Sequence, residues 1–209
     1  MKKYAMTVSP FSIIACGLLI SPVWNSELVV LFIINGIWLV LELIIAKRQV
    51  FQDQVPRQWW IMASRVLWLC SVVLIFADLR WELVPLRTPR PIVIGTLYFL
   101  AAGLIIRLVA YIQLGRFFTY DIRVGEGHKL ITTGIYSIIR HPAYLAVCIL
   151  GSLPGLAAGS VIACILMTVF TIPQTLYRLN SEEKMLSNIY QEVFDKYREK
   201  SWRLLPFIY

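Results

Sequence analysis

Long apolar runs alternate with short polar segments along almost the whole chain. The runs cover residues 10–24, 27–46, 58–77, 91–114, 142–153 and 159–178. The second, third, fourth and last runs are long enough to cross a bilayer, because a transmembrane helix needs about 20 apolar residues. The fifth run is shorter and ends at the turn signal Gly151-Ser152-Leu153-Pro154-Gly155. This pattern predicts that the last two runs form a helical hairpin.

The composition extends this interpretation to the whole chain. Hydrophobic residues make up 58% of the sequence and charged residues only 15%, and the mean hydropathy is +0.70. Soluble globular domains are less apolar and more charged. We therefore expect an all-α fold, a polytopic membrane helical bundle of five to six membrane segments that includes the C-terminal hairpin.

The chain is too short for a separate soluble domain beside these helices. We expect residues 1–114 to hold the N-terminal transmembrane helices. Residues 115–209 should hold a polar loop, the hairpin and a C-terminal amphipathic helix, with a small unit facing the aqueous phase.

The distribution of charge indicates a membrane topology and no nucleic-acid partner. The formal net charge is +8, but the basic residues lie in short loops between apolar runs and form no single stripe. If all six runs cross, one side of the membrane receives most of the lysines and arginines, and the opposite loop keeps Arg80, Arg87 and Arg90. Cytoplasmic loops are enriched in Lys and Arg, so we expect both termini and the polar loop to face the cytoplasm.

Two arginines lie inside apolar runs, where an unpaired charge costs at least about 2.5 kcal/mol. They are Arg65 and Arg107. One interpretation is contact with a substrate or lipid headgroup within the bundle. The other is snorkelling to a helix end or pairing with Glu42 or a backbone carbonyl.

The cysteines predict no metal site. Cys16, Cys70, Cys148 and Cys164 all lie in apolar runs, without CxxC spacing or a histidine partner at a metal-binding distance in sequence. Cysteine without a partner is often buried, so we expect these four to be small core residues.

The densest polar segment is residues 128–144, which we call the cassette. Its polar rings are His128, Tyr136, His141 and Tyr144, and glycines at 125, 127 and 134 allow the backbone to bend tightly. Pro142 suits the first turn of a helix, with His141 extended at the cap. The N–H groups that follow would then be available to an anionic group.

A second polar piece follows the last apolar run. A continuing helix places Arg178 and Glu182 on one face, with Glu183 next to them, and an exposed ion pair alone would also explain this spacing. Further on, Tyr190, Phe194 and Tyr197 fall at helical spacing among charged residues. This predicts an amphipathic helix whose aromatic stripe packs against the core or the membrane interface.

Together these pieces resemble the isoprenylcysteine carboxyl methyltransferase family. The shared elements are the cassette pattern H-x-L-[IV]-T-x-G-x-Y-x-x-x-R-H-P-x-Y, an apolar hairpin, R-x-x-x-E-E at 178–183, Phe194 with Tyr197, and Leu205-Pro206-Phe207. Leu114 to Thr119 is similar to the family's approach to the cassette. The resemblance covers roughly the C-terminal half, from Gly103 onward.

The resemblance implies a multi-pass membrane enzyme with a cytoplasmic catalytic face, which transfers a methyl group from S-adenosylmethionine to the carboxylate of a lipophilic, isoprenylcysteine-like substrate entering from the bilayer. Arg178 matches the arginine that holds the substrate. The implied cofactor contacts are His128, Lys129, Leu130, Ile131, Tyr136, His141, Pro142, Ala143, Tyr144 and Glu182. One position departs from the family pattern: Arg123 stands where eukaryotic members have a cofactor-contacting glutamine.

The chemistry of the cofactor agrees with these residue types. The helix N-terminus after His141 suits its carboxylate, Glu182 suits its ammonium group, and tyrosine and leucine side chains can flank adenine. A substrate carboxylate is ionised at neutral pH and needs no general base, so Arg178 would orient it.

Three other functions are compatible with the same pattern. A phospholipid or other small-lipid methyltransferase would act on an amine and require a base, for which His128 or Tyr136 could be proposed. A membrane reductase of the steroid-reductase type would bind NADPH, which favours a phosphate-binding loop that the sequence does not show. In a non-enzymatic membrane scaffold, the cassette would be only a connecting loop.

Overall fold

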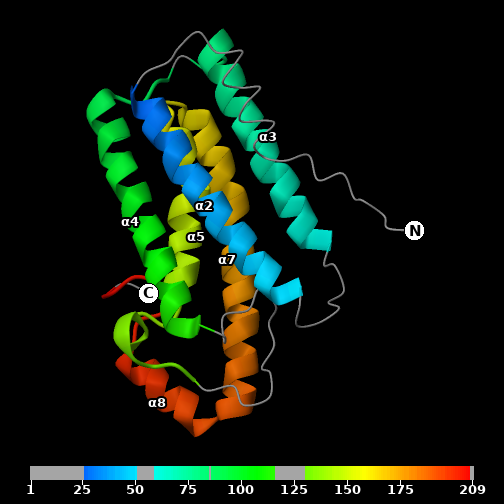
Figure 1. Ribbon diagram of the computed structural model, residues 1–209, viewed down its shortest axis with the longest axis vertical. Helices are drawn as coiled ribbons and strands as arrows, with labels where there is room; N and C mark the ends of the chain where they lie inside the picture. The colour runs from blue at the N-terminus through cyan, green and yellow to red at the C-terminus, as the bar shows by residue number, and fades with distance from the viewer. Residues whose placement is uncertain (1–25, 51–58, 85, 116–129, 208–209) are drawn as a thin grey trace.

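The computed structural model describes residues 26–50, 59–84, 86–115 and 130–207, with the side chains of 46–50 and 59–69 left out. The first predicted apolar helix, residues 10–24, lies outside these ranges. Figure 1 shows a bundle of long helices with a smaller group of short elements at one end.

The described elements are helical, as predicted, and two isolated β-bridges are the only strand-like pairs among them. In chain order they are α2 (Ser26–Val50), α3 (Trp59–Trp81), α4 (Arg90–Leu114), the 3-10 helix η2 (Gly134–Ser137), α5 (Pro142–Ser152), α6 (Pro154–Ala157), α7 (Val161–Tyr190) and α8 (Glu192–Lys200).

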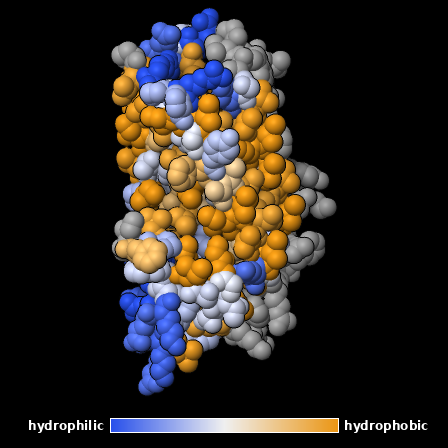
Figure 2. Space-filling view, turned by 90° about the vertical axis from the view of Figure 1, so that its left-hand side faces the viewer, coloured by the Kyte–Doolittle hydropathy of each residue, from blue (hydrophilic) through white to orange (hydrophobic). Residues whose placement is uncertain are grey.

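Three of the described helices are long and apolar enough to cross a membrane, and the chain is a multi-pass integral membrane protein. The candidate spans are Ser26–Ile45, Arg90–Leu114 and Val161–Tyr190. Large apolar side chains cover their outer faces, among them Ile33, Ile105, Ile112, Ile165 and Val169. Figure 2 shows the result, a broad hydrophobic belt between two hydrophilic ends.

Small residues let the central helices approach closely. A Cβ atom added at Gly103 of α4 would stand 2.8 Å from Cγ2 of Ile149 on α5, so a larger residue would push these helices apart. Leu100, Leu150 and Met167 fill the core beside this crossing. Close approach over small residues is a usual means of helix packing in membranes, where the hydrophobic effect does not drive association.

The predicted hairpin is present. α5 ends at Ser152, the single turn of α6 follows, and α7 begins at Val161. The hydroxyl of Ser160, the N-cap of α7, accepts a hydrogen bond from the Ala163 N–H at 3.3 Å. α5 has 11 residues, about half the length that a full span requires. The hairpin therefore has one short arm and one long arm.

At the end of the bundle away from the cassette, two of the arginines that the sequence assigned to one loop are paired. Arg87 Nη1 lies 2.9 Å from Oδ2 of Asp78, whose side chain is buried, and Nη2 donates to the Asp78 carbonyl. Arg90 pairs with Glu27 at 2.8 Å. Ion pairs with local carboxylates hold these cations in place.

The predicted aromatic stripe is divided between two helices. α7 runs on to Tyr190, and Gln191, with φ of 44°, separates it from α8. Phe194 and Tyr197 are buried on α8 and pack on Leu186 of α7. Tyr190, the last residue of α7, packs against the same cluster, so the predicted packing role is confirmed for all three aromatic residues.

Candidate functional site

The cassette's helix starts where the sequence predicts. Pro142 is the first residue of α5 and His141 is its N-cap, with φ of −127° and ψ of 57°, which is not the extended conformation that the sequence predicts. The amides of Tyr144 and Leu145 donate to the His141 carbonyl at 3.1 Å each. The His141 side chain caps no N–H of the first turn, so this helix end keeps its affinity for an anionic group.

The second polar piece meets this helix end. Because α7 is continuous through residue 182, Arg178 and Glu182 share a face one turn apart. The Arg178 guanidinium carbon lies 5.7 Å from the centre of the Tyr144 ring, within the range of a cation–π contact. The Tyr144 hydroxyl interacts with the Glu182 carboxylate. Three predicted site residues from two helices are thus in one place.

Tyr136 completes this group from η2. Its ring is buried, and its hydroxyl donates to the Ala110 carbonyl of α4 at 3.4 Å. Burial raises the pKa of Tyr136 well above its usual value, and the Glu182 carboxylate raises it further. At neutral pH this hydroxyl therefore stays protonated. We call Tyr136, Tyr144, Arg178 and Glu182 the site group.

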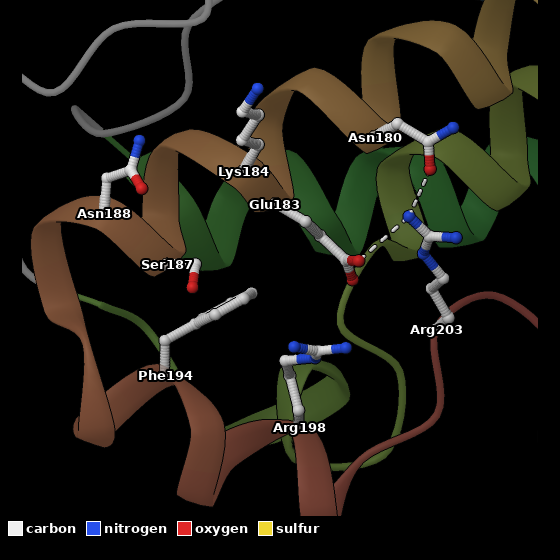
Figure 3. A pocket seen from close by; sticks show the side chains of 8 residues that line it. All are labelled: Asn180, Glu183, Lys184, Ser187, Asn188, Phe194, Arg198 and Arg203. Carbon is white, nitrogen blue, oxygen red and sulfur yellow. Dashed lines mark hydrogen bonds and ion pairs between the residues drawn. The ribbon is translucent and has the colours of Figure 1, made fainter.

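Glu183, next to Glu182 in sequence, has a different set of partners, of which Figure 3 shows Arg203. Its Oε1 lies 3.1 Å from Arg140 Nε and 3.1 Å from His141 Nε2, and its Oε2 lies 2.9 Å from Arg203 Nη2. The structure thus directs the imidazole of His141, a predicted cofactor contact, to Glu183. One carboxylate joins the cassette, α7 and the C-terminal segment.

The C-terminal tail, residues 201–207, runs alongside the cassette. The amides of Arg140 and His141 donate to the carbonyls of Trp202 and Arg203 at 2.7 and 3.2 Å, and the Trp202 amide donates back to Ile138 at 2.8 Å. These bonds form a short parallel pairing around Ile139 and Trp202. The cassette backbone is fixed from a part of the chain far away in sequence.

α8 adds a contact beneath the cassette. The Tyr197 ring packs in the cluster with Leu186 and Phe194, and its hydroxyl donates to the Tyr136 carbonyl at 2.6 Å. Burial raises the pKa of Tyr197 to about 12, so this donor is intact at neutral pH. Sequence periodicity indicated a buried face here but gave no sign of the hydrogen bond.

Arg107 pairs with Glu42, one of its two predicted roles. Its Nε and Nη2 lie 2.8 and 3.1 Å from the two Glu42 oxygens, and Trp38 Nε1 also donates to Glu42 at 3.0 Å. A third nitrogen, Nη1, donates to the Ala143 carbonyl at 3.3 Å. The pair therefore connects α2 and α4 to the first turn of α5. The side chain of Arg65 lies outside the described residues.

One positioning contact was not predicted from the sequence. Gln113, at the end of α4, accepts a hydrogen bond from the Ile135 amide at 3.0 Å. Gly134 beside it has φ of 63°, and a Cβ atom there would collide with the Gln113 side chain. The Gly134 in the cassette pattern is the one signal that could have indicated such a close approach.

Not every predicted contact falls in the described ranges. His128, Lys129 and Arg123 lie outside them. Leu130 packs against the cluster formed by Leu186, Phe194 and Tyr197. The other predicted contacts in the described cassette are Ile131, Pro142 and Ala143. Pro142 is buried in the first turn of α5, and the other two are half-buried.

A pocket of about 290 Å³ lies on the Glu183 side of α7 (Figure 3). Its described lining residues are Asn180, Glu183, Lys184, Ser187, Asn188, Phe194, Arg198 and Arg203. None of these residues is a predicted cofactor contact, although Glu183 also holds the imidazole of His141. Within residues 26–50, 59–84, 86–115 and 130–207, no cluster of His, Cys, Asp and Glu could hold a metal ion.

Comparison with known proteins gives one consistent family. Residues 95–188 match the model of the isoprenylcysteine carboxyl methyltransferase (ICMT) family. A probable protein-S-isoprenylcysteine O-methyltransferase of Oryza sativa subsp. indica is 33% identical over 113 residues, which are 51% of this chain and 56% of that protein. The protein-S-isoprenylcysteine O-methyltransferase of Schizosaccharomyces pombe is 27% identical over 116 residues, 54% and 49% of the two chains. The chain thus matches about half the length of these relatives.

A solved structure extends the similarity in fold. The eukaryotic intramembrane Ras methyltransferase ICMT superposes with a TM-score of 0.70 at 18% identity, over 95% of this chain and 74% of that chain. The similarity of fold therefore includes the N-terminal helices, which precede the segment that the family model matches.

Proposed function

We propose that the protein is an integral membrane methyltransferase, because residues 95–188 match the model of the isoprenylcysteine carboxyl methyltransferase family. It would transfer a methyl group from S-adenosylmethionine to the carboxylate of a lipophilic, isoprenylcysteine-like substrate. The observation that supports this most is the convergence of Tyr136, Tyr144, Arg178 and Glu182 at the N-terminus of α5. All four residues lie within the matched segment.

The chemistry of the described residues fits the cofactor. Glu182 supplies a carboxylate for the ammonium group, and the N-terminus of α5, which has no side-chain cap, supplies N–H groups for the carboxylate. The rings of Tyr136 and Tyr144 offer apolar surface for adenine. The cofactor, when bound, supplies a methyl group activated by the sulfonium ion. His128, Lys129, Leu130, Ile131, His141, Pro142 and Ala143 remain predicted contacts on the strength of the resemblance.

Arg178 is proposed to orient the acceptor carboxylate. A guanidinium group can hold a carboxylate through two parallel hydrogen bonds, which restricts the direction of its attack. The contact of Arg178 with the Tyr144 ring fixes the guanidinium group beforehand. The acceptor is ionised at neutral pH, so the residues have to position it and do not have to remove a proton.

The same geometry favours a carboxylate over an amine as acceptor. An amine must lose a proton, and Tyr136, one of the two bases considered, has a raised pKa because it is buried. A buried tyrosine hydroxyl that stays protonated at neutral pH is a poor general base. The other, His128, lies outside the described residues.

We place the catalytic face in the cytoplasm. The loops on the cassette side carry most of the lysines and arginines. Two of the three arginines of the opposite loop are paired with Asp78 and Glu27, so they serve local structure. The lipophilic acceptor would then enter laterally from the bilayer, while the cofactor arrives from the cytoplasm.

Calorimetric titration of the detergent-solubilised protein tests the proposal. S-adenosylhomocysteine should bind, and NADPH should give no heat. Heat from NADPH alone would support the reductase, and the absence of heat from either ligand would count against both enzymes.

Variants of the site group test the assigned roles. Glu182→Ala should abolish S-adenosylhomocysteine binding, because the ammonium group loses its counter-charge. Arg178→Ala should retain binding and lose methyl transfer to a prenylcysteine analogue. Glu199→Ala, an exposed position on α8, is the matched control and should behave like wild type. Normal methylation by both site variants would exclude this site.

A further inference from the structure

The C-terminal tail has two different sides. On its inner side, Arg203 pairs with Glu183 and Leu204 is buried. On its outer side, Trp202, Leu205 and Phe207 are exposed by 41%, 44% and 86%. The Trp202 and Phe207 rings lie 5.5 Å apart, so they form one continuous apolar surface. We call these three residues the tail patch.

The tail patch lies at the foot of α4, where the apolar belt ends. Figure 1 shows the tail beside the lower end of this helix. The contacts agree, because Trp202 pairs with the cassette at Ile138, and Tyr136 of the cassette donates to the Ala110 carbonyl in the last turns of α4. On the same turns, Leu108 and Ile112 are exposed to the surroundings of the belt. The patch thus continues the lipid-facing surface.

Its composition suits the boundary between headgroups and acyl chains. Tryptophan is enriched at membrane interfaces, because its ring is apolar and its N–H is polar. Leucine and phenylalanine beside it add apolar surface whose exposure to water is unfavourable. Exposed apolar patches of this kind mark sites that bind a membrane or another protein. The neighbouring Arg140 and Arg203 turn inward to Glu183, so no guanidinium from these two covers the patch.

We propose that the tail patch is an interfacial membrane anchor. Trp202, Leu205 and Phe207 insert into the headgroup boundary of the leaflet that borders the cassette, and the tail thereby ties the cassette to the phospholipid surface. The occupant of the patch is phospholipid. This role depends on the membrane-spanning fold and is independent of the proposed methyl transfer.

The full-length protein, reconstituted in phosphatidylcholine vesicles, allows a direct test. The emission of Trp202 is obtained as the difference between wild type and Trp202→Phe, since the chain has 7 tryptophans. Phosphatidylcholine brominated in the upper acyl chain should quench this difference signal by at least about half, and aqueous iodide should leave it unchanged. Phe207→Trp adds a second reporter, whose extra emission should respond in the same way.

Two results would overturn the anchor. Quenching by iodide without quenching by brominated lipid would place the patch in water. Protection from both quenchers, lost when the protein is diluted in lipid, would assign the patch to a second copy of this chain. Neither experiment involves a cofactor, so failure of the anchor leaves the proposed function untouched, and the reverse holds as well.

Discussion

Buried ion pairs occur at both ends of the helical bundle, and the two ends use them differently. At the end away from the cassette, Asp78 takes up Arg87 and also accepts from the Val84 amide at 3.1 Å, so the carboxylate closes a loop onto α3. At the cassette end, the two adjacent carboxylates Glu182 and Glu183 have different partners. Glu183 is surrounded by Arg140, His141 and Arg203, while Glu182 interacts with Tyr144.

The difference shows that one helix can carry a structural carboxylate and a binding-site carboxylate at adjacent positions. Successive residues of a helix point about 100° apart, so neighbours in sequence face different partners. Glu183 fixes the cassette from one side of α7, and Glu182 is left for the site group on the other. The far end has no such division, because each of its two carboxylates, Asp78 and Glu27, pairs with an arginine of the same end in the part of the chain that the structure describes. Charge burial alone therefore does not identify a site.

The largest expected effect is that of Glu183→Ala. The change leaves Arg140, His141 and Arg203 without their shared carboxylate, and removing one member of a buried ion pair typically costs about 3–5 kcal/mol. Titration with sodium dodecyl sulfate in mixed micelles should show a strongly reduced unfolding midpoint, and cofactor affinity should fall with it. A wild-type midpoint would show that Glu183 is not the structural link.

Asp78→Asn should have a smaller effect on stability and none on binding. Arg87 is partly exposed and can turn to water, so the loss should be about 1–3 kcal/mol, in the range for a buried hydrogen-bonded group. The midpoint should fall while the affinity for S-adenosylhomocysteine stays at the wild-type value. A change of affinity would contradict the conclusion that the end away from the cassette has only a structural role.

Tyr197→Phe isolates one hydrogen bond at the cassette end. The hydroxyl that donates to Tyr136 is lost, which should cost about 1 kcal/mol. Because folding raises the pKa of Tyr197 from 10.0 to about 12, the stabilising effect of its hydroxyl should be complete well below pH 10 and should decrease as the pH rises from 10 towards 12. Unfolding midpoints measured across this range would check the sign, and a difference that grew with pH would refute it.

The smallest effect is expected from Arg90→Ala, at the far end. The Arg90 side chain is 75% exposed, and exposed ion pairs contribute little to stability. The unfolding midpoint should match that of wild type at physiological salt. A clear loss would mean that the two arginine pairs of this end are equivalent, which their exposure argues against.

The sequence predicted the elements of the fold well, because local signals mark their ends. Apolar runs of membrane length gave the long helices, and the Gly-Ser-Leu-Pro-Gly segment gave the hairpin. Pro142 marked the start of α5. The break at Gln191 escaped prediction, since neither glycine nor proline marks it and its positive φ is unusual for such a residue.

For the site, periodicity could place Arg178 and Glu182 on one face of α7 but could not choose partners across the fold. Glu42 was named as one possible partner of Arg107, 65 positions away, but the sequence left snorkelling and substrate contact open, and only the structure selects the pair. The partners of Glu183 come from the cassette and the tail, which the sequence presents as unrelated segments. Long-range choices of this kind depend on packing, which no local pattern records.

The pairing of the tail with the cassette also has a consequence for biosynthesis. The membrane helices can insert in order as the ribosome makes them, but Arg140 donates to Ser201, which is synthesised 61 residues later. A nascent chain arrested before residue 201 would therefore be fully inserted up to α7 and would still have an unfinished cassette. In this architecture insertion precedes completion of the polar end, so quality control could meet a chain that is correctly embedded in the membrane and not yet competent to bind.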